Sequence, residues 1–127
     1  MTVLSIAVVV PSTDPDTAIA RYTALLDPDA IEQFPLPGGT LTVTVLPGLS
    51  ILSGDEHAVA PVRDLRATLF VDSLALTRER LERTGWTAEG TLDPRASLLA
   101  RDPDGLLFEF VERMPGPLGP ATGRDAS

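Results

Sequence analysis

The sequence predicts an α+β fold built from two copies of a βαβββ module, within one domain that spans residues 1–113. A β-branched run at residues 3–10 ends at Pro11, and a signal for the start of a helix and then three strand patterns follow it. After a linker without periodicity at residues 54–64, the same order of elements begins again. The 127 residues of the chain suffice for one domain with a buried core. The predicted modules span residues 1–54 and 65–113.

In the first module, the predicted helix begins after Asp14, which can cap it, and Pro15 suits the first helical position. Tyr22 shares one face of this helix with apolar residues, so we expect it in the core. Threonine and apolar residues alternate along residues 40–45, which is the clearest strand pattern in the chain. The other two strands after the helix are predicted at residues 30–34 and 49–53.

In the second module, Ser73 caps the predicted helix and Gly85 ends it as a left-handed cap. The turn Asp-Pro-Asp-Gly at residues 102–105 has proline at its second position and glycine at its fourth. The predicted strands are residues 65–71, 87–92, 96–101 and 106–112. Residues 114–127, with three prolines and three glycines, are predicted to form a flexible tail.

Composition excludes several classes of function. The chain has no cysteine, and all ten basic residues are arginine, so disulfides, thiolate chemistry and lysine Schiff bases are ruled out. A net charge of −8 disfavours nucleic acid and anionic membranes as partners and favours a cationic ligand, although most acidic residues fall in predicted turns and read as a solvated surface. No basic residue precedes the N-terminal apolar run, and prolines interrupt residues 33–54, so we expect a cytoplasmic protein.

Glu109 is the only polar residue within residues 106–111. Its neighbours on the same strand face are Leu107 and Val111, which predicts that its carboxylate is partly buried. A buried carboxylate needs either a partner or a raised pKa. Glu109 is therefore the first candidate for a functional residue.

The final hairpin, in which the turn at residues 102–105 leads into a short apolar strand that holds a glutamate, resembles the vicinal-oxygen-chelate superfamily of glyoxalase, bleomycin-resistance and ring-cleaving dioxygenase proteins. Residues 71–74 and 84–85, around the second helix, and residues 14–25 resemble the same family, and the match covers residues 3–113. The resemblance implies two βαβββ modules that form a curled mixed sheet around a cleft. It also implies a homodimer.

In metal-using members of this family, the ligands come from the first strand, the strand that opens the second module, the fourth strand and the glutamate of the last strand. Carried over by position, these sites fall at Ala7 or Ser5, Arg66, residues 51–53 and Glu109. Only Glu109 keeps a ligand side chain, whereas a catalytic divalent site typically has three protein ligands. The positions carried over from the resemblance therefore disfavour a divalent metal cofactor, and a metal bound through Glu109 stays the alternative.

The single histidine, His57, lies in the predicted linker, and we expect it to be exposed to solvent rather than to complete a metal site. Arg66 is a candidate partner for Glu109, because the family places the first and last strands of a module side by side. Two interpretations stay open. The pair lines the cleft and anchors a polar ligand, with Glu109 as a base, or it forms a structural salt bridge in place of a metal.

Further candidates for ligand contacts are hydroxyl groups and one aromatic ring. Trp86 follows a helix end and either stacks on a ligand or closes the core. The hydroxyl groups either line the cleft or belong to solvated strand faces. The hydroxyl candidates are Ser5, Thr42, Thr44 and Thr68.

Three functions compete. The first is a metal-independent protein that binds or sequesters a small molecule in the cleft between modules, as bleomycin-resistance proteins do. The second is a glyoxalase-like lyase, an isomerase or a ring-cleaving dioxygenase in which Glu109 binds a metal or acts alone as a base. The third is a structural or partner-binding role. The chain has no glycine-rich phosphate loop and no Ser-His-Asp arrangement, so kinase and hydrolase chemistry have no support.

Overall fold

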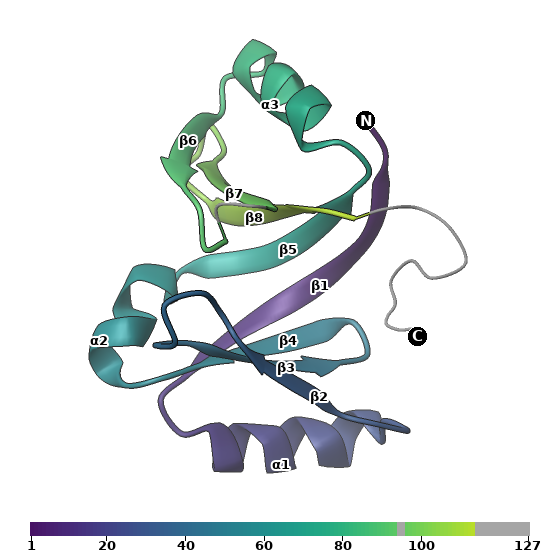
Figure 1. Cartoon of the computed structure of the whole chain (residues 1–127), viewed down its shortest axis with the longest axis vertical. Coiled ribbons are helices and arrows are strands. Elements are labelled where there is room, and N and C mark those ends of the chain that lie inside the picture. The colour runs from purple at the N-terminus through teal and green to yellow at the C-terminus, as the bar shows by residue number, and fades with distance from the viewer. Residues whose placement is uncertain (94–95, 114–127) are drawn as a thin grey trace. The chain divides into compact units, whose positions relative to one another are not determined.

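The computed structural model describes residues 1–93 and 96–113, so the predicted tail at residues 114–127 lies outside the described residues. The elements follow the predicted order, βαβββ twice, and the predicted α+β fold class is confirmed (Figure 1). The strands are β1 (Val3–Ser12), β2 (Glu32–Pro35), β3 (Thr42–Leu46), β4 (Leu49–Ser53), β5 (Leu65–Val71), β6 (Thr87–Gly90), β7 (Ser97–Arg101) and β8 (Leu107–Glu112). The helices are α1 (Pro15–Leu26), α2 (Glu56–Val59), the 3₁₀ turn η1 (Ala60–Val62) and α3 (Leu74–Arg83).

The chain divides into two compact units. The first unit is residues 7–66, and the second unit is residues 1–6 together with the chain from residue 67 onward. The start of β1 thus belongs with the second half of the sequence: the backbone N–H of Thr2 donates to the Asp72 carboxylate at 2.8 Å, and the N–H of Asp72 donates to the Thr2 carbonyl at 3.2 Å. None of the helices in the described part of the chain is both long and apolar enough to cross a bilayer.

In the first unit, the strand order is β2-β3-β4-β1. The pairs β2–β3 and β3–β4 are antiparallel, whereas β1 runs parallel to β4, with Val8 opposite Leu49. Helix α1 begins where Asp14 accepts a hydrogen bond from the Thr17 N–H, as the sequence predicted. The helix packs on the sheet through a core that includes the predicted Tyr22; its members are Ala18, Leu46, Ile51, Val10, Ile19, Tyr22, Leu26 and Leu49.

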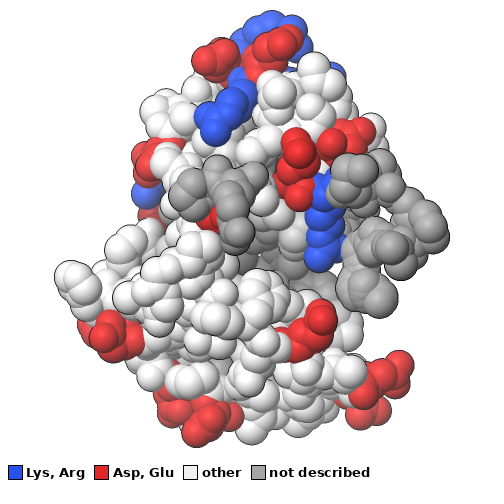
Figure 2. Space-filling model, viewed as in Figure 1, with Lys and Arg blue, Asp and Glu red and all other residues white. Residues whose placement is uncertain are grey.

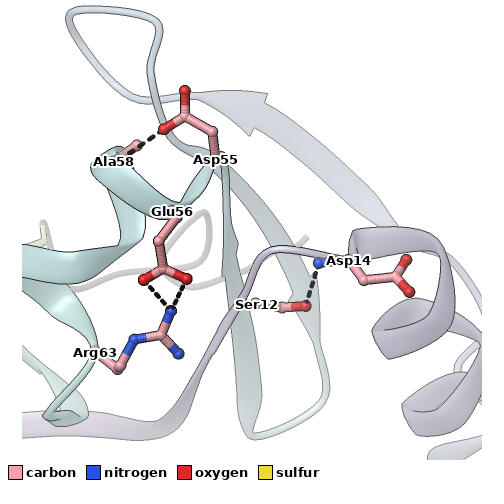
Figure 3. Close-up of polar contacts among 6 residues, drawn as sticks. All are labelled: Ser12, Asp14, Asp55, Glu56, Ala58 and Arg63. Carbon is pink, nitrogen blue, oxygen red and sulfur yellow. Dashed lines mark hydrogen bonds and ion pairs between the residues drawn. The ribbon is translucent and has the colours of Figure 1, made fainter.

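The linker at residues 54–64, in which the sequence shows no periodicity, contains the short helix α2 and the turn η1 (Figure 3). Asp55 caps the short helix α2 by accepting a hydrogen bond from the Ala58 N–H at 2.8 Å. Glu56 pairs with Arg63 across the turn that follows, at 2.7 Å. A single helical turn is too short to show a hydrophobic period, so the sequence pattern could not reveal it.

In the second unit, β5 neighbours β8, followed by β7 and β6. Strands β7 and β8 form the predicted antiparallel hairpin, with Leu99 opposite Glu109 and Arg101 opposite Leu107. Helix α3 begins at the predicted cap, Ser73, which accepts a hydrogen bond from Leu76 N–H. A core cluster lies under α3, and its members are Val71, Ala100, Phe110, Met1, Leu69, Leu74, Leu81, Trp86 and Phe108.

The surface charge is dispersed. Figure 2 shows the Asp and Glu side chains in separate small groups on the visible face rather than in one acidic patch. On α3, acidic and basic side chains alternate, and Arg83 pairs with Glu79 one helical turn away at 3.8 Å. This distribution agrees with a solvated surface and gives no sign of a dedicated docking patch on that face.

Candidate functional site

Glu109 lies in the middle of β8, on the face of the sheet opposite to the α3 core. Its sequence neighbours Phe108 and Phe110 both belong to the cluster beneath α3. Because successive side chains of a strand point to opposite faces, the Glu109 carboxylate points away from α3. Its exposed fraction is only 9%, and it is the only ionisable side chain in the buried set of the described residues.

Two hydroxyl groups hold the Glu109 carboxylate. The Thr68 hydroxyl, on the neighbouring strand β5, donates to Oε1 at 2.9 Å. The Ser97 hydroxyl, at the start of β7, donates to the Asp93 carbonyl at 3.2 Å and also acts on this carboxyl group, whose pKa it lowers. Ser97 reaches it because Leu99 is directly opposite Glu109, so Ser97 is the diagonal neighbour on the same face. Both hydroxyl groups are buried, with exposed fractions of 6% for Thr68 and 2% for Ser97.

The pKa of Glu109 is raised above its ordinary value of 4.5. Burial is the main cause, because it removes water from the ionised carboxylate. The hydrogen bonds from Thr68 and Ser97 act in the opposite direction, and the nearby Asp93 carboxylate adds to the rise by charge repulsion. The carboxyl group therefore keeps its proton to a higher pH than an exposed glutamate does.

Ser97 connects Glu109 to a second hydroxyl group, that of Thr91. The Thr91 and Ser97 hydroxyl oxygens are 2.7 Å apart. The backbone N–H of Asp93 donates to both of these oxygens at 3.0 Å. Thr91 is exposed, whereas Ser97 is buried, so this network runs from the surface toward the buried carboxyl group. Neither Thr91 nor Ser97 was among the site residues predicted from the sequence.

No family model matches the chain, and no curated protein matches it in sequence. Among solved structures, an uncharacterized protein from Methanosarcina mazei is 27% identical, the alignment covers 88% of this chain and 94% of that one, and the TM-score is 0.77. Methylmalonyl-CoA epimerase from Mycobacterium tuberculosis is 20% identical, with coverage of 91% and 90% and a TM-score of 0.60. The chain therefore shares its fold with these two solved structures.

The fold that the resemblance implied is thus confirmed. A hypothetical protein from Bacillus halodurans also aligns, at 14% identity with 87% and 94% of the two chains covered and a TM-score of 0.56. At 20% identity or less, such likeness concerns the path of the backbone. The chemistry has to be argued from the side chains of this chain.

The metal ligands implied by the superfamily do not fit the residues that are present. Ala7 and Ile51 are buried aliphatic side chains without a donor atom, and His57 is exposed on α2. Within residues 1–93 and 96–113, no group of three His, Cys, Asp or Glu side chains is arranged to hold a metal ion. The Glu109 carboxylate is instead surrounded by neutral hydroxyl groups, which are weak ligands compared with imidazole or carboxylate.

Thr68 takes the place that the sequence analysis gave to Arg66. Both residues lie on the same face of β5, but Arg66 is exposed, and the hydrogen bonds of Glu109 go to Thr68 and Ser97. The residue of β5 that hydrogen-bonds to Glu109 is thus Thr68. Arg66 and Thr68 are two residues apart, which along a strand is about 6–7 Å. A shift of this size in the pairing of β5 with β8 decides whether Glu109 meets the charged or the neutral side chain.

The remaining candidates make other contacts. Trp86 packs against Phe108 and Phe110, each at 5.7 Å between ring centroids, on the α3 side of the sheet and so not on the Glu109 face. Thr44 is fully buried and accepts a hydrogen bond from the Gln33 side chain at 3.0 Å. Ser5 and Thr42 are half-buried. Of the predicted site residues, the structure joins Glu109 and Thr68 by a direct contact.

Proposed function

We propose that this chain binds a small molecule, without a metal ion, on the face of the second unit that carries Glu109. One observation carries the proposal: among the residues that the structure describes, the partners of this buried carboxyl group are two neutral hydroxyl groups and no cation. Burial of a carboxyl group without a positive partner destabilises a folded protein, and an apolar side chain would be more favourable there. Retention of such a group at a sheet face is typical of a binding or catalytic site.

The chemistry of this face suggests which groups a ligand would offer. In its protonated form, the Glu109 carboxyl donates a hydrogen bond to a carbonyl oxygen, and in its ionised form it accepts one from an N–H group. A net charge of −8 over the whole chain supports a ligand that is neutral or cationic rather than anionic. Sequestration of such a molecule needs no further catalytic group, which agrees with the set of side chains around Glu109.

A second candidate function is proton transfer by Glu109 in a lyase or isomerase reaction. The raised pKa supports it, because a carboxylate with a pKa nearer to neutral is a stronger base at the pH of the cell. This chemistry also needs no metal. Binding alone remains the leading proposal, since the described residues around Glu109 include no second acid or base that contacts it by a hydrogen bond.

The first test combines metal analysis with ligand screening. We expect protein purified without chelator to contain far less than one equivalent of zinc, nickel or iron, and Glu109→Gln to leave this content unchanged. Stoichiometric metal that is lost in Glu109→Gln would overturn the proposal.

The screen uses a library of fragment-sized ketones, amides and amines, observed by amide chemical shifts. We expect the active fragments to shift the amides of residues 67–69, 97–99 and 108–110, and Glu109→Gln to abolish these shifts. Glu82→Gln, which removes an exposed carboxylate on α3, is the matched control and should keep them. Shifts that persist in Glu109→Gln would show that binding does not involve this carboxyl group.

A further inference from the structure

We propose that Phe70 and Arg113 form a second anchor beside Glu109, and that the ligand is an ω-amino acid with its amine at Glu109 and its carboxylate at Arg113. The inference deepens the proposed function and rests on it, because it takes Glu109 as the group that meets the ligand. The main observation is the Arg113 guanidinium, which lies 4.2 Å from the centre of the Phe70 ring. An ω-amino acid is neutral as a whole, so the net charge of −8 does not repel it.

Phe70 and Arg113 lie on the face of the sheet that carries Glu109. Both sequence neighbours of Phe70 belong to the core cluster beneath α3. Glu112, the residue before Arg113, accepts a hydrogen bond from the first backbone N–H of α3 at 2.7 Å. Because successive side chains of a strand point to opposite faces, Phe70 and Arg113 point away from α3, as the Glu109 carboxyl group does.

The two anchors follow each other along the seam between the neighbouring strands β5 and β8. Thr68 hydrogen-bonds to Glu109, and Phe70, two residues further along β5, contacts Arg113 just after the end of β8. The backbone N–H of Arg113 donates to the Val71 carbonyl at 2.8 Å, which holds the chain beside β5 at this point. Two residues of a strand span about 6–7 Å. A ligand that reaches both anchors therefore needs several carbon atoms between its amine and its carboxylate.

The surface between the anchors is apolar. Val111 lies midway between Glu109 and Arg113 in the sequence, shares their face of the sheet and is half-buried. Leu99 of β7, directly opposite Glu109, is half-buried on the same face. The methylene groups of an ω-amino acid can pack against these side chains, which removes apolar surface from water.

Each anchor has the chemistry that its end of the ligand needs. The ionised Glu109 carboxylate accepts hydrogen bonds from an ammonium group. Stacking on Phe70 occupies a flat face of the guanidinium, whereas its five N–H donors lie in its plane. Arg113 can therefore donate to a carboxylate in addition to the other contacts it makes. The competing explanation is that Arg113 only fixes the end of β8, and that role predicts no dependence on the carboxylate of a ligand.

The test uses the full chain and three probes, observed by amide chemical shifts. 5-Aminopentanoate carries both charged groups, pentylamine lacks the carboxylate and pentanoate lacks the amine. We expect 5-aminopentanoate to bind more tightly than the other two probes. Arg113→Gln should weaken its binding about tenfold, because a charge-assisted hydrogen bond is lost, and should weaken pentylamine binding less than about twofold. Arg78→Gln, which removes an exposed arginine on α3, is the matched control and should change neither.

Equal weakening of both probes by Arg113→Gln would overturn the inference, as would unchanged binding of 5-aminopentanoate or no binding of this probe to the wild type. If Arg113→Gln does not fold, Phe70→Leu, which removes the stacking, decides by the same comparison of probes. Glu109→Gln separates the two proposals. If pentylamine binding depends on Glu109 but 5-aminopentanoate does not respond to Arg113→Gln, the second anchor fails and the proposed function stands. If no probe or fragment depends on Glu109, the proposed function fails.

Discussion

At the scale of single residues, the ionised Glu109 carboxylate is a local source of instability. It is buried, its donors are the neutral hydroxyl groups of Thr68 and Ser97, and the Asp93 carboxylate repels it. A buried polar group that lowers the stability of the fold is more readily explained by a role in binding or catalysis than by a role in folding. This trade-off can be measured through the pH dependence of stability.

Because burial raises the pKa of Glu109 in the folded state above 4.5, the group is protonated in both states at low pH and there is no penalty. As the pH rises above 4.5, the unfolded state releases its proton first, so the folded state loses stability until the pH passes the folded-state pKa. We expect Glu109→Gln to unfold with a free energy close to that of wild type at pH 4.5 and about 1 kcal/mol above it at pH 8. Urea unfolding at both values of pH measures this difference.

Glu82→Gln is the control, because it removes one negative charge from an exposed position on α3. If Glu109→Gln instead lowers the free energy of unfolding at pH 8 by 1 kcal/mol or more, the carboxylate stabilises the fold and its role is structural.

The sequence revealed Glu109 because a single charged residue stands out in an apolar strand, and Thr68 because it lies on the polar face of β5. It did not reveal that Thr68, and not Arg66, is the residue of β5 that contacts Glu109. That choice depends on the stagger between β5 and β8, which packing sets and local sequence pattern does not. Ser97 was within reach of the sequence analysis. The turn at residues 102–105 sets Arg101 opposite Leu107, and counting back along both strands makes Ser97 the diagonal neighbour of Glu109.

At the scale of elements, hairpins and helices with strong end signals were predictable, whereas short irregular segments were not. The cap at Ser73 and the turn at residues 102–105 are local signals, since their chemistry fixes the backbone directly. Helix α2 has only one turn and follows Gly54, which sits where the chain leaves β4. Its position depends on a close approach that no pattern of hydrophobic residues encodes.

Gly54 is required by this close approach. A Cβ atom at this position would lie 2.5 Å from the backbone carbonyl oxygen of Thr40 and 3.1 Å from the Ala58 Cβ. We expect Gly54→Ala to lower the free energy of unfolding by about 2–3 kcal/mol. Gly48→Ala is the comparison, because Gly48 has a φ of +70° but open space around it, and should cost about 1 kcal/mol. A smaller effect at Gly54 than at Gly48 would contradict the packing around α2.

At the scale of the whole molecule, the repeat of βαβββ was readable because each module carries its own strand and helix signals in the same order. The assignment of residues 1–6 was not readable, since these residues precede the first helix yet belong with the second half of the chain. The link is made by backbone and carboxylate contacts between Thr2 and Asp72, which are far apart in the sequence. The predicted cleft, the homodimer and the cytoplasmic location stay predictions.

Removal of residues 1–6 tests this division of the chain. We expect amide hydrogen exchange to accelerate mainly within residues 67–113, with local opening free energies lower by about 2 kcal/mol, because the truncated chain loses the Thr2–Asp72 contacts and the packing of Met1. Residues 13–66 should keep most of their protection. Faster exchange confined to residues 13–66 would show that the N-terminal segment belongs with the first half of the chain.

The central claim is that Glu109 is a buried carboxyl group held by hydroxyl groups and independent of metal. The most direct test is the pH titration of its ¹³C carboxyl resonance, with and without one equivalent of Zn²⁺. We predict a midpoint above 4.5 that added Zn²⁺ leaves unchanged, because Thr68 and Ser97 are its partners. A midpoint at or below 4.5, or one that falls when Zn²⁺ is added, would contradict the claim.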